Sequence, residues 1–244
     1  MSQAMSLDAE HVGELAVSAV HGPAWYGQAP AFGQMATSIV LSGCNLRCRF
    51  CDVPWTWDPA EPTSVDAVLA EVDAQGAPLA VVTGGEPLLQ QHEPGWGQLL
   101  AGLRARGKTV FVETNGTVWP TRETVLQASR LVVSPKLANA SLPAEERIVP
   151  DILRALAAVE GTVFTFICRR PHDVDEVAAL AADLAIPAAQ VWIVPEGQHP
   201  RVLTEVTARL LGRVDQYRFN LSPRLIMITA RPHVLPGYFR SSIS

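Results

Sequence analysis

The sequence predicts an α/β fold, a partial (β/α)6 barrel in a single domain. From residue 35 onward, six short apolar segments rich in β-branched residues alternate with helix-like segments. Such nearly continuous hydrophobic strands are typical of a parallel sheet covered on both faces, and each helical segment is long enough for a crossover connection. The length of 244 residues suits one large domain. Six units make a smaller barrel than the eight-unit form of about 250 residues.

The expected elements alternate in chain order. Strands are expected over residues 35–42, 79–83, 109–113, 130–134, 162–168 and 191–194. Helices are expected over residues 63–75, 97–106, 121–129, 150–160, 173–185 and 199–211. Thr63 or Ser64 is the expected N-cap of the first helix, because a side-chain oxygen there accepts from a free backbone N–H, and Gly76 marks its end.

The remaining segments are less regular. Residues 1–34 are interpreted as an N-terminal loop region, in which residues 21–34 form a loop with aromatic anchors, and residues 35–244 as the barrel. Residues 135–150 are the longest interruption and are interpreted as a surface insertion or lid. The tail from Tyr217 is expected to supply closing strands. No linker divides these parts, so they are expected to belong to one domain.

Composition and charge exclude several classes of function. With 48% hydrophobic and 18% charged residues, the chain can bury a large core. Its net charge of −5 and the lack of a Lys/Arg cluster argue against nucleic acid as a partner. No apolar run approaches the roughly 18 residues of a membrane span, and residues 1–10 do not resemble a signal peptide. A cytoplasmic protein without a membrane partner is therefore expected.

Three of the four cysteines lie close together, directly after the first expected strand. Cys44, Cys48 and Cys51 have the spacing C-x3-C-x2-C. In a reducing compartment such a group indicates metal or redox chemistry. Three thiolates on one loop can hold three irons of a [4Fe-4S] cluster and leave the fourth iron open. A zinc site and three unrelated buried cysteines are the alternatives, although structural zinc normally needs a fourth ligand and Cys168 is isolated.

This cysteine spacing, with Phe50 before the last cysteine, resembles the radical S-adenosylmethionine (SAM) superfamily. The resemblance implies a partial barrel, a [4Fe-4S] cluster on the three cysteines, and SAM chelating the open iron. It also implies SAM contacts near Phe50 and Asp52 and at four expected strand ends, the usual ligand face of such a barrel. Those segments are Gly84-Gly85-Glu86 in TGGEP, Glu113 and Asn115 in ETNG, Ser134-Pro135-Lys136, and Val194-Pro195-Glu196-Gly197. The Glu86 carboxylate is expected to meet the SAM ammonium group.

Taken together, GCNLRCRFCD, TGGEPLLQ, VETNGT, VSPK and VPEG most resemble the 7-carboxy-7-deazaguanine synthase family of queuosine and deazapurine biosynthesis. The resemblance implies a carbon-nitrogen lyase that converts 6-carboxy-5,6,7,8-tetrahydropterin to 7-carboxy-7-deazaguanine. Ammonia is lost, and a 5′-deoxyadenosyl radical abstracts and returns a hydrogen atom. Trp25, Tyr26, Gly27, Gln28 and Thr83 are the expected substrate contacts, so residues 1–34 become the substrate-loop region.

Three positions depart from the family pattern. Val53 replaces a hydroxyl residue that contributes to a Mg²⁺ site, and an alkyl group cannot bind a cation that prefers oxygen. Gln28 replaces a glutamate of the substrate loop, and Val40 stands where the family tends to have an arginine. Mg²⁺ binding is therefore doubtful. Loss of this arginine removes a bidentate carboxylate clamp that no neighbour obviously replaces. One explanation is a divergent synthase that uses other contacts, such as Arg47, Lys136, Arg224 or Arg231.

Two other kinds of radical SAM enzyme fit the sequence less well. One is a paralogue that acts on a different small molecule of specialised metabolism, and the other is an activating enzyme that makes a glycyl radical on a partner protein. A non-catalytic iron–sulfur protein would not need TGGEP or ETNG. The resemblance further implies a flavodoxin- or ferredoxin-type electron donor, and a homodimer is expected. Trp55 and Trp57 are expected to pack beside the cluster or stack on a ligand.

Overall fold

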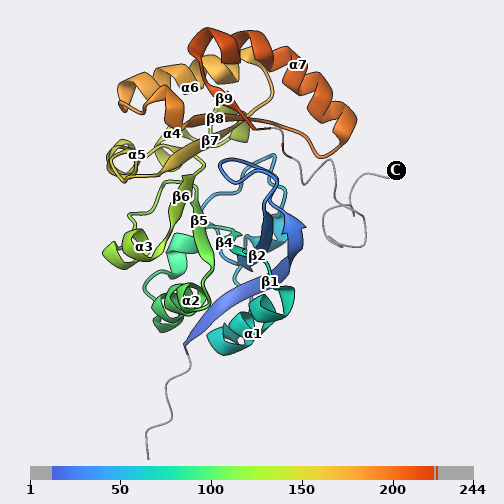
Figure 1. Cartoon of the computed structure of the whole chain (residues 1–244). Coiled ribbons are helices and arrows are strands. Elements are labelled where there is room, and N and C mark those ends of the chain that lie inside the picture. Colours follow the sequence, from blue (N-terminus) through green and yellow to red (C-terminus); the bar gives the residue numbers. More distant parts are fainter. Residues whose placement is uncertain (1–12, 223, 225–244) are drawn as a thin grey trace, which may run out of the picture.

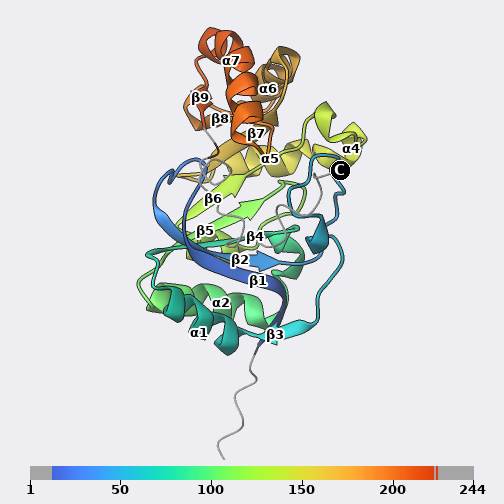
Figure 2. The same ribbon diagram turned by 90° about the vertical axis from the view of Figure 1, so that its right-hand side faces the viewer.

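A twisted sheet of nine strands organises residues 13–222 and 224, the part of the chain that the computed structural model describes (Figures 1 and 2). Its spatial order is β3-β1-β2-β4-β5-β6-β7-β8-β9. All neighbours from β2 to β9 are parallel, whereas β1 is antiparallel to both β2 and β3. No pairing between β9 and β3 closes the described sheet, so the fold is the expected partial barrel.

The six predicted strands and six predicted helices are confirmed. The strands are β2 (Met35–Leu41), β4 (Leu79–Gly84), β5 (Thr109–Thr114), β6 (Arg130–Val133), β7 (Val163–Cys168) and β8 (Val191–Pro195). The helices are α1 (Val65–Gln75), α2 (Pro94–Ala105), α3 (Arg122–Gln127), α5 (Pro150–Ala157), α6 (Pro171–Asp183) and α7 (Pro200–Tyr217). Ser64 caps α1 by accepting from the Ala67 amide, and Gly76 ends that helix with a φ of 70°.

The N-terminal region differs from the expected loop. Glu14–Trp25 form strand β1, which pairs with β2 and with the short strand β3 (Pro62–Ser64). Gly22 and Pro23 hide this strand in the sequence, because both residues usually argue against a strand interior. The β1–β2 register shifts between His21 and Ala24, so an irregularity accommodates them. Only the residues after β1, up to Gln34, form the predicted loop.

Two other irregular segments contain short elements. Residues 135–150 hold a 3₁₀ turn, Ala138–Ala140, and the one-turn helix α4 (Ala144–Arg147). The expected closing strands begin with β9 (Asn220–Leu221), which pairs with β8. Residue 223 and the rest of the tail from residue 225, including Arg231, lie outside the described residues.

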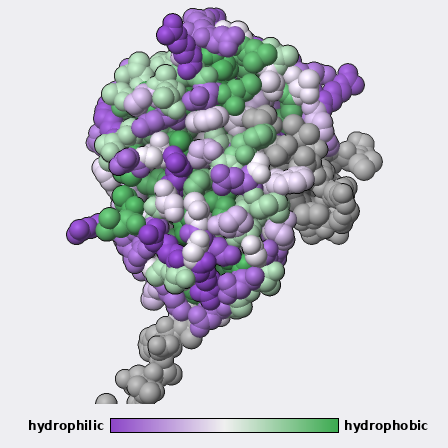
Figure 3. Space-filling view, viewed as in Figure 1, coloured by the Kyte–Doolittle hydropathy of each residue, from purple (hydrophilic) through white to green (hydrophobic). Residues whose placement is uncertain are grey.

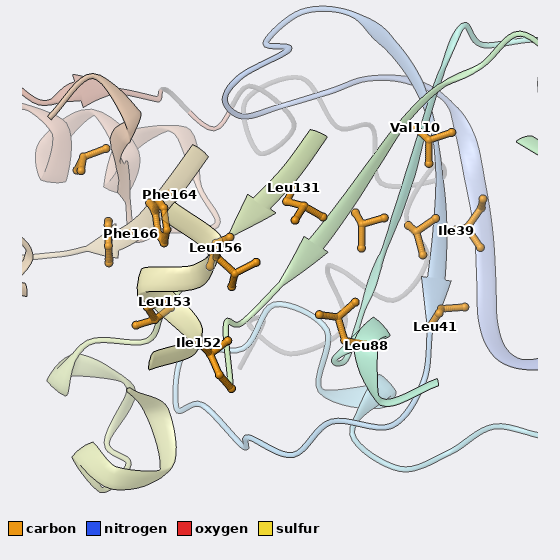
Figure 4. Packing of buried hydrophobic residues seen from close by; sticks show 14 of the residues in the cluster. Ile39, Leu41, Leu88, Val110, Leu131, Ile152, Leu153, Leu156, Phe164 and Phe166 are labelled. Atoms are coloured by element: carbon orange, nitrogen blue, oxygen red, sulfur yellow. The ribbon is translucent and has the colours of Figure 1, made fainter. Parts of the chain in front are cut away.

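The main core lies between the sheet and the helices. Figure 4 shows Ile152, Leu153 and Leu156 of α5 beside the strand residues Leu131 and Phe164. Side chains alternate between the two faces of a strand, so the neighbouring strand positions point into the barrel instead. There Leu79, Val81, Phe111, Val132 and Val163 form a second cluster with Tyr26, Ala31 and Ala36. Helices therefore cover the outside, and the 26–34 loop contributes to the packing inside.

Long-range contacts hold the 26–34 loop across the barrel. The Tyr26 and Phe111 rings meet edge to face with centroids 6.0 Å apart. The Ala29 amide donates to Ser222 Oγ at 3.1 Å, which links this loop to the residue after β9. The loop between β1 and β2 therefore reaches the β9 edge of the open sheet. Its packing against the amino ends of β4 and β5, through Leu79 and Phe111, leaves the carboxyl ends of the strands for a cavity.

Apolar and hydrophilic residues are interspersed over the coloured part of the face in Figure 3. Large exposed apolar side chains include Trp25 and Phe32, at and after the end of β1, and Trp119, Leu126 and Leu211 in other parts of the chain. Scattered residues of this kind are normal on a protein surface. Within the described residues, none of the helices has the length and apolar character needed to cross a bilayer.

Candidate active site

A cavity of about 560 Å³ opens at the carboxyl ends of the parallel strands. This volume is in the range typical of small-molecule sites. Its wall includes all three clustered cysteines, the glycines of TGGEP, and side chains that end β4 and β5. The expected substrate-loop residues Trp25, Tyr26, Gly27 and Gln28 line the same cavity. The fold thus brings the cysteine loop and the N-terminal loop to one space.

The cysteine loop follows β2 and is fixed by backbone hydrogen bonds. Gly43 has a φ of 87°, a conformation that favours glycine, and turns the chain out of the strand. The Gly43 amide donates to Thr56 O at 2.8 Å, and the Cys44 amide donates to Trp57 O at 3.1 Å. The Cys51 amide donates to Cys48 O at 3.1 Å, which closes the second half of the loop. These bonds hold the cysteines as one unit.

Burial controls the protonation of the three thiols. It raises the pKa of Cys44 to about 11 and also raises the pKa of Cys48 and Cys51. The positive charge of Lys136 opposes this rise at Cys48 and Cys51. Iron binding requires thiolates, so it must displace protons from these buried groups. Phe50, Leu46 and Leu142 pack around them and form the apolar surroundings.

Two glycines let the TGGEP turn pack against the cysteine loop. A Cβ atom on Gly84 would lie 2.0 Å from Leu41 O, and one on Gly85 would lie 2.2 Å from Gly43 O. Both contacts are with backbone atoms, which cannot rotate away. The Gly85 amide donates to Leu41 O and the Glu86 amide to Gly43 O. The glycines line the cavity, and they also permit the joint between β4 and the cysteine loop.

Glu86 is placed differently from its expected SAM contact. Its side chain is fully buried and, within the described residues, is not part of the cavity wall. The carboxylate accepts from the Leu88 amide at 3.0 Å, Thr114 Oγ1 at 2.9 Å and the Asn115 amide at 2.6 Å. Burial still raises its pKa. Glu86 therefore holds the end of β5 against the TGGEP turn, and its contact with SAM stays a prediction.

Glu113 is the centre of the polar network in the cavity. Its carboxylate accepts from Tyr26 Oη at 2.6 Å, Gln28 Nε2 at 3.0 Å and Thr83 Oγ1 at 2.5 Å. Burial, and secondly the negative charge of Glu113, raise the pKa of Tyr26 well above its usual value, so the phenol stays a donor. The sequence suggested Glu113 for SAM and the three donors for substrate. The structure brings all four together, a grouping that no local motif indicates.

Asn115 and Lys136 also line the cavity. Asn115 Nδ2 donates to Asn45 Oδ1 at 2.9 Å and connects ETNG to the cysteine loop. Lys136 Nζ donates to Ser134 Oγ at 2.9 Å. The buried Arg147 donates to Lys136 O at 2.8 Å and pairs with Glu176. The 135–150 segment thus fixes the backbone of a cavity lysine.

The 194–197 segment is placed differently from its expected SAM contact. Within the described residues, neither Val194-Pro195-Glu196-Gly197 nor Pro135 lines the cavity. Glu196 is buried, and its Oε1 accepts from Arg169 at 3.0 Å. Its buried Oε2 has no hydrogen-bond partner in the described part of the chain. The SAM contacts expected of this segment and of Pro135 therefore stay predictions.

Comparison with known proteins agrees with these motifs. The model of the Radical SAM superfamily matches residues 38–133. The 7-carboxy-7-deazaguanine synthase of Hyperthermus butylicus is 34% identical over 84% of this chain and 89% of its own length. The synthase of Pyrobaculum aerophilum is 32% identical over 82% of this chain and 87% of its own length.

The chain belongs to the 7-carboxy-7-deazaguanine synthase family.

Among solved structures, QueE from Escherichia coli has the same fold. It superposes with a TM-score of 0.64 at 21% identity, covering 85% of this chain and 92% of that chain. SuiB of Streptococcus suis, solved with its precursor peptide SuiA, gives a TM-score of 0.54 at 13% identity, covering 76% of this chain and 47% of that chain. The fold is therefore shared by proteins of very different sequence.

The cysteine loop fits the iron–sulfur cluster of the superfamily. Within the described residues, no three His, Cys, Asp or Glu side chains are arranged to hold one metal ion, as a zinc site would need. A cubane cluster instead takes each thiolate on a different iron. Among the described residues, the buried indole N–H of Trp57 has no hydrogen-bond acceptor, and its position near Cys51 lowers the pKa of that thiol, against the rise caused by burial. A cluster at this position would supply its acceptor.

The four arginine and lysine candidates of the sequence have different surroundings. Arg47 is exposed and pairs with Asp58 at 2.7 Å, and its guanidinium lies 5.4 Å from the Trp57 ring centroid. Arg47 is not part of the described cavity wall. Lys136 and Arg224 line the cavity. Trp55 and Trp57 line it too, beside the cysteine loop. Of the four, Arg231 lies outside the described residues.

Proposed function

We propose that this protein converts 6-carboxy-5,6,7,8-tetrahydropterin to 7-carboxy-7-deazaguanine with loss of ammonia, as a radical SAM enzyme. One observation carries this proposal: the three cysteines, the TGGEP glycines and the Glu113 network open into the same cavity. The relatives at 32–34% identity are named as synthases of this product, which favours it over another small molecule or a glycyl-radical partner.

In this proposal the cysteine side of the cavity holds the cofactors. Cys44, Cys48 and Cys51 would bind three irons of a [4Fe-4S] cluster. When bound, the cluster and SAM supply a 5′-deoxyadenosyl radical. The SAM contacts would come from Phe50, Asp52, Gly84, Gly85, Glu86, Asn115, Ser134, Pro135, Lys136, Val194, Pro195, Glu196 and Gly197. The exposed backbone at Gly84 and Gly85 would allow close approach of the ligand.

The N-terminal side would orient the substrate. Tyr26, Gln28 and Thr83 donate to Glu113 and hold its carboxylate in one orientation. A carboxylate has about four lone-pair positions, and these three donors leave about one of them, on Oε2, for a ligand. An N–H donor of the amino-pyrimidinone edge of a pterin would occupy it. Trp25 and Gly27 complete this part of the wall.

The remaining proposals concern the setting of the enzyme. A flavodoxin- or ferredoxin-type protein would deliver the electron, and the enzyme would act as a cytoplasmic homodimer. The four described cysteines are free, which agrees with a reducing compartment. A small molecule is the expected substrate because the cavity is of about 560 Å³.

An anaerobic assay tests the proposed reaction. The reconstituted protein is incubated with dithionite, SAM and 6-carboxytetrahydropterin, and 7-carboxy-7-deazaguanine and ammonia are quantified. Both products are expected in equal amounts, and neither with the Cys44→Ala variant. 5′-Deoxyadenosine formation without ring contraction would contradict the proposal and favour a paralogue with another substrate.

A further inference from the structure

Asp52 and Arg224 form an ion pair on the cavity wall. Asp52 follows the last clustered cysteine, and Arg224 belongs to the segment after β9. The Arg224 and Asp52 side chains are only 10% and 14% exposed. Arg224 Nη2 donates to Asp52 Oδ2, and Gln198 Nε2 donates to Oδ1 at 3.1 Å. Both carboxylate oxygens of Asp52 are therefore engaged by protein donors.

This position does not fit the divalent cation that the family resemblance implies. Magnesium prefers near-octahedral oxygen coordination. Val53, the next residue, carries no oxygen in its side chain. A buried guanidinium already neutralises Asp52, and it would repel a second cation at the same carboxylate. No step of the reaction is therefore assigned to magnesium in this protein.

The guanidinium keeps binding capacity that the described protein does not use. Arginine has five N–H donors in a planar fork. Among the described residues, Arg224 donates to Asp52 and, through Nη1 at 3.4 Å, to Gly197 O. The other donors can serve a ligand in the cavity that Arg224 lines. Asp52 and Gly197 fix the orientation of the fork, which reduces the entropy lost when a ligand binds.

The proposed substrate needs a cation in this cavity. Its carboxylate is attached to the carbon that loses a hydrogen atom, so the group must enter the site with its charge. A buried carboxylate is costly unless it is paired and hydrogen-bonded. Arg224 and Lys136 are the Arg and Lys side chains on the described wall, and Lys136 Nζ donates to Ser134 Oγ at 2.9 Å. Arg224, whose planar fork is oriented by Asp52 and Gly197, is the cation that can pair with a carboxylate through two N–H groups.

We infer that the Arg224 guanidinium takes the place of a divalent cation beside Asp52 and binds the carboxylate of the pterin substrate. The inference rests on the proposed function and adds the group that recognises the carboxylate. Arg224 is then a substrate-binding residue, and Asp52 and Gln198 position it. Carboxylate recognition in this protein follows from a fixed organic cation and does not require Mg²⁺.

A binding experiment tests this inference without turnover. The probes are 6-carboxypterin and pterin, which differ in the carboxylate, measured by equilibrium dialysis on reconstituted protein with SAM in metal-depleted buffer. Arg224→Gln should weaken 6-carboxypterin binding by about tenfold or more, because a charge-assisted bidentate contact is lost, and leave pterin binding unchanged. Added Mg²⁺ should not alter either affinity of the native protein. Arg154→Gln is the matched control and should match the native protein, because Arg154 lies on α5, pairs with Asp151 at 3.0 Å and is not part of the described cavity wall.

The remaining outcomes of the binding experiment separate failure of the inference from failure of the proposed function. Unchanged 6-carboxypterin affinity in Arg224→Gln, or a marked tightening of native binding by Mg²⁺, overturns the role of Arg224 and leaves the proposed function standing. If Arg224→Gln loses both probes, Arg224→Lys decides: selective weakening of 6-carboxypterin supports the inference, and equal loss of both overturns it. Failure of the native protein to bind either pterin overturns the proposed function, and the inference with it.

Discussion

The two sides of the cavity are built in different ways. On the cysteine side, backbone atoms define the geometry: Gly84 and Gly85 lie where a Cβ would approach a carbonyl oxygen to 2.0–2.2 Å. On the other side, hydrogen bonds between pairs of side chains define the geometry: Tyr26 donates to Glu113, and Arg224 donates to Asp52. Backbone packing tolerates few substitutions, whereas side-chain pairs can change together. We therefore expect the cysteine side to vary less among relatives than the side built from side-chain pairs.

The largest expected effect distinguishes the clustered cysteines from the fourth. Replacing Cys44, Cys48 or Cys51 by alanine should abolish cluster assembly and activity, whereas reconstituted native protein should hold about four irons per chain. Cys168→Ala is the control, since this thiol is fully buried on β7 and away from the cavity wall. Iron analysis and absorption spectra measure the outcome. Loss of the cluster in Cys168→Ala would show that the three-cysteine assignment is wrong.

A second prediction tests the backbone joint on the cysteine side. Gly85→Ala places a Cβ 2.2 Å from Gly43 O and must separate the TGGEP turn from the cysteine loop. A loss of about 3 kcal/mol or more in the free energy of unfolding is expected, since the new Cβ would meet a backbone carbonyl that cannot rotate away. Urea denaturation of the cluster-free protein measures it.

The control for this variant is Gly212→Ala in α7. A Cβ there meets no atom within 4 Å, so the change should be neutral or stabilising. An equally small effect of Gly85→Ala would show that the joint can relax. The cysteine side would then be no more constrained by its backbone than the substrate side.

A third prediction concerns the side-chain network. Tyr26→Phe removes the 2.6 Å hydrogen bond to Glu113 and should raise the Michaelis constant for the pterin about tenfold to a hundredfold, the usual worth of a bond to a charged group. SAM affinity should stay unchanged. Tyr217→Phe is the control, because its hydroxyl donates to Asp175 on α6 at 2.8 Å, away from the described cavity wall. If Tyr26→Phe weakened the binding of SAM and of the pterin equally, Glu113 would have to contribute to SAM binding as well.

The contrast between geometry set by local backbone and geometry set by distant side-chain pairs also explains what the sequence could predict. Strands, helices and the cysteine loop follow from local periodicity, spacing and the glycines, so they were predictable. The Tyr26–Glu113 contact joins residues 87 positions apart, and the Asp52–Arg224 contact joins residues 172 positions apart. No local pattern indicates such pairs. Strand β1 was missed because Gly22 and Pro23 interrupt its pattern, and the burial of Glu86 depends on donors from β5.

The smallest expected effect is a change in the pH dependence of stability at Glu86. Burial raises its pKa above the ordinary 4.5 despite three hydrogen-bond donors, so the folded protein binds this proton at a pH where the unfolded chain has released it. Stability then falls as pH rises from the ordinary value through the raised one. Glu86→Gln cannot titrate, so the free energy of unfolding of the native protein minus that of the variant should decrease over this window.

Urea denaturation of cluster-free protein at a series of pH values measures that difference. Glu145→Gln, at an exposed position on α4, gives the cost of the same substitution where nothing is buried. A difference that grows with rising pH would mean that the three donors outweigh burial and lower the pKa. Glu86 would then be an ordinary stabilised carboxylate of the β5 end. If the free energy of unfolding of the native protein minus that of Glu86→Gln decreases with rising pH, the charged carboxylate is unfavourable in the folded protein. A cation beside Glu86, such as the SAM ammonium group, would then stabilise that charge.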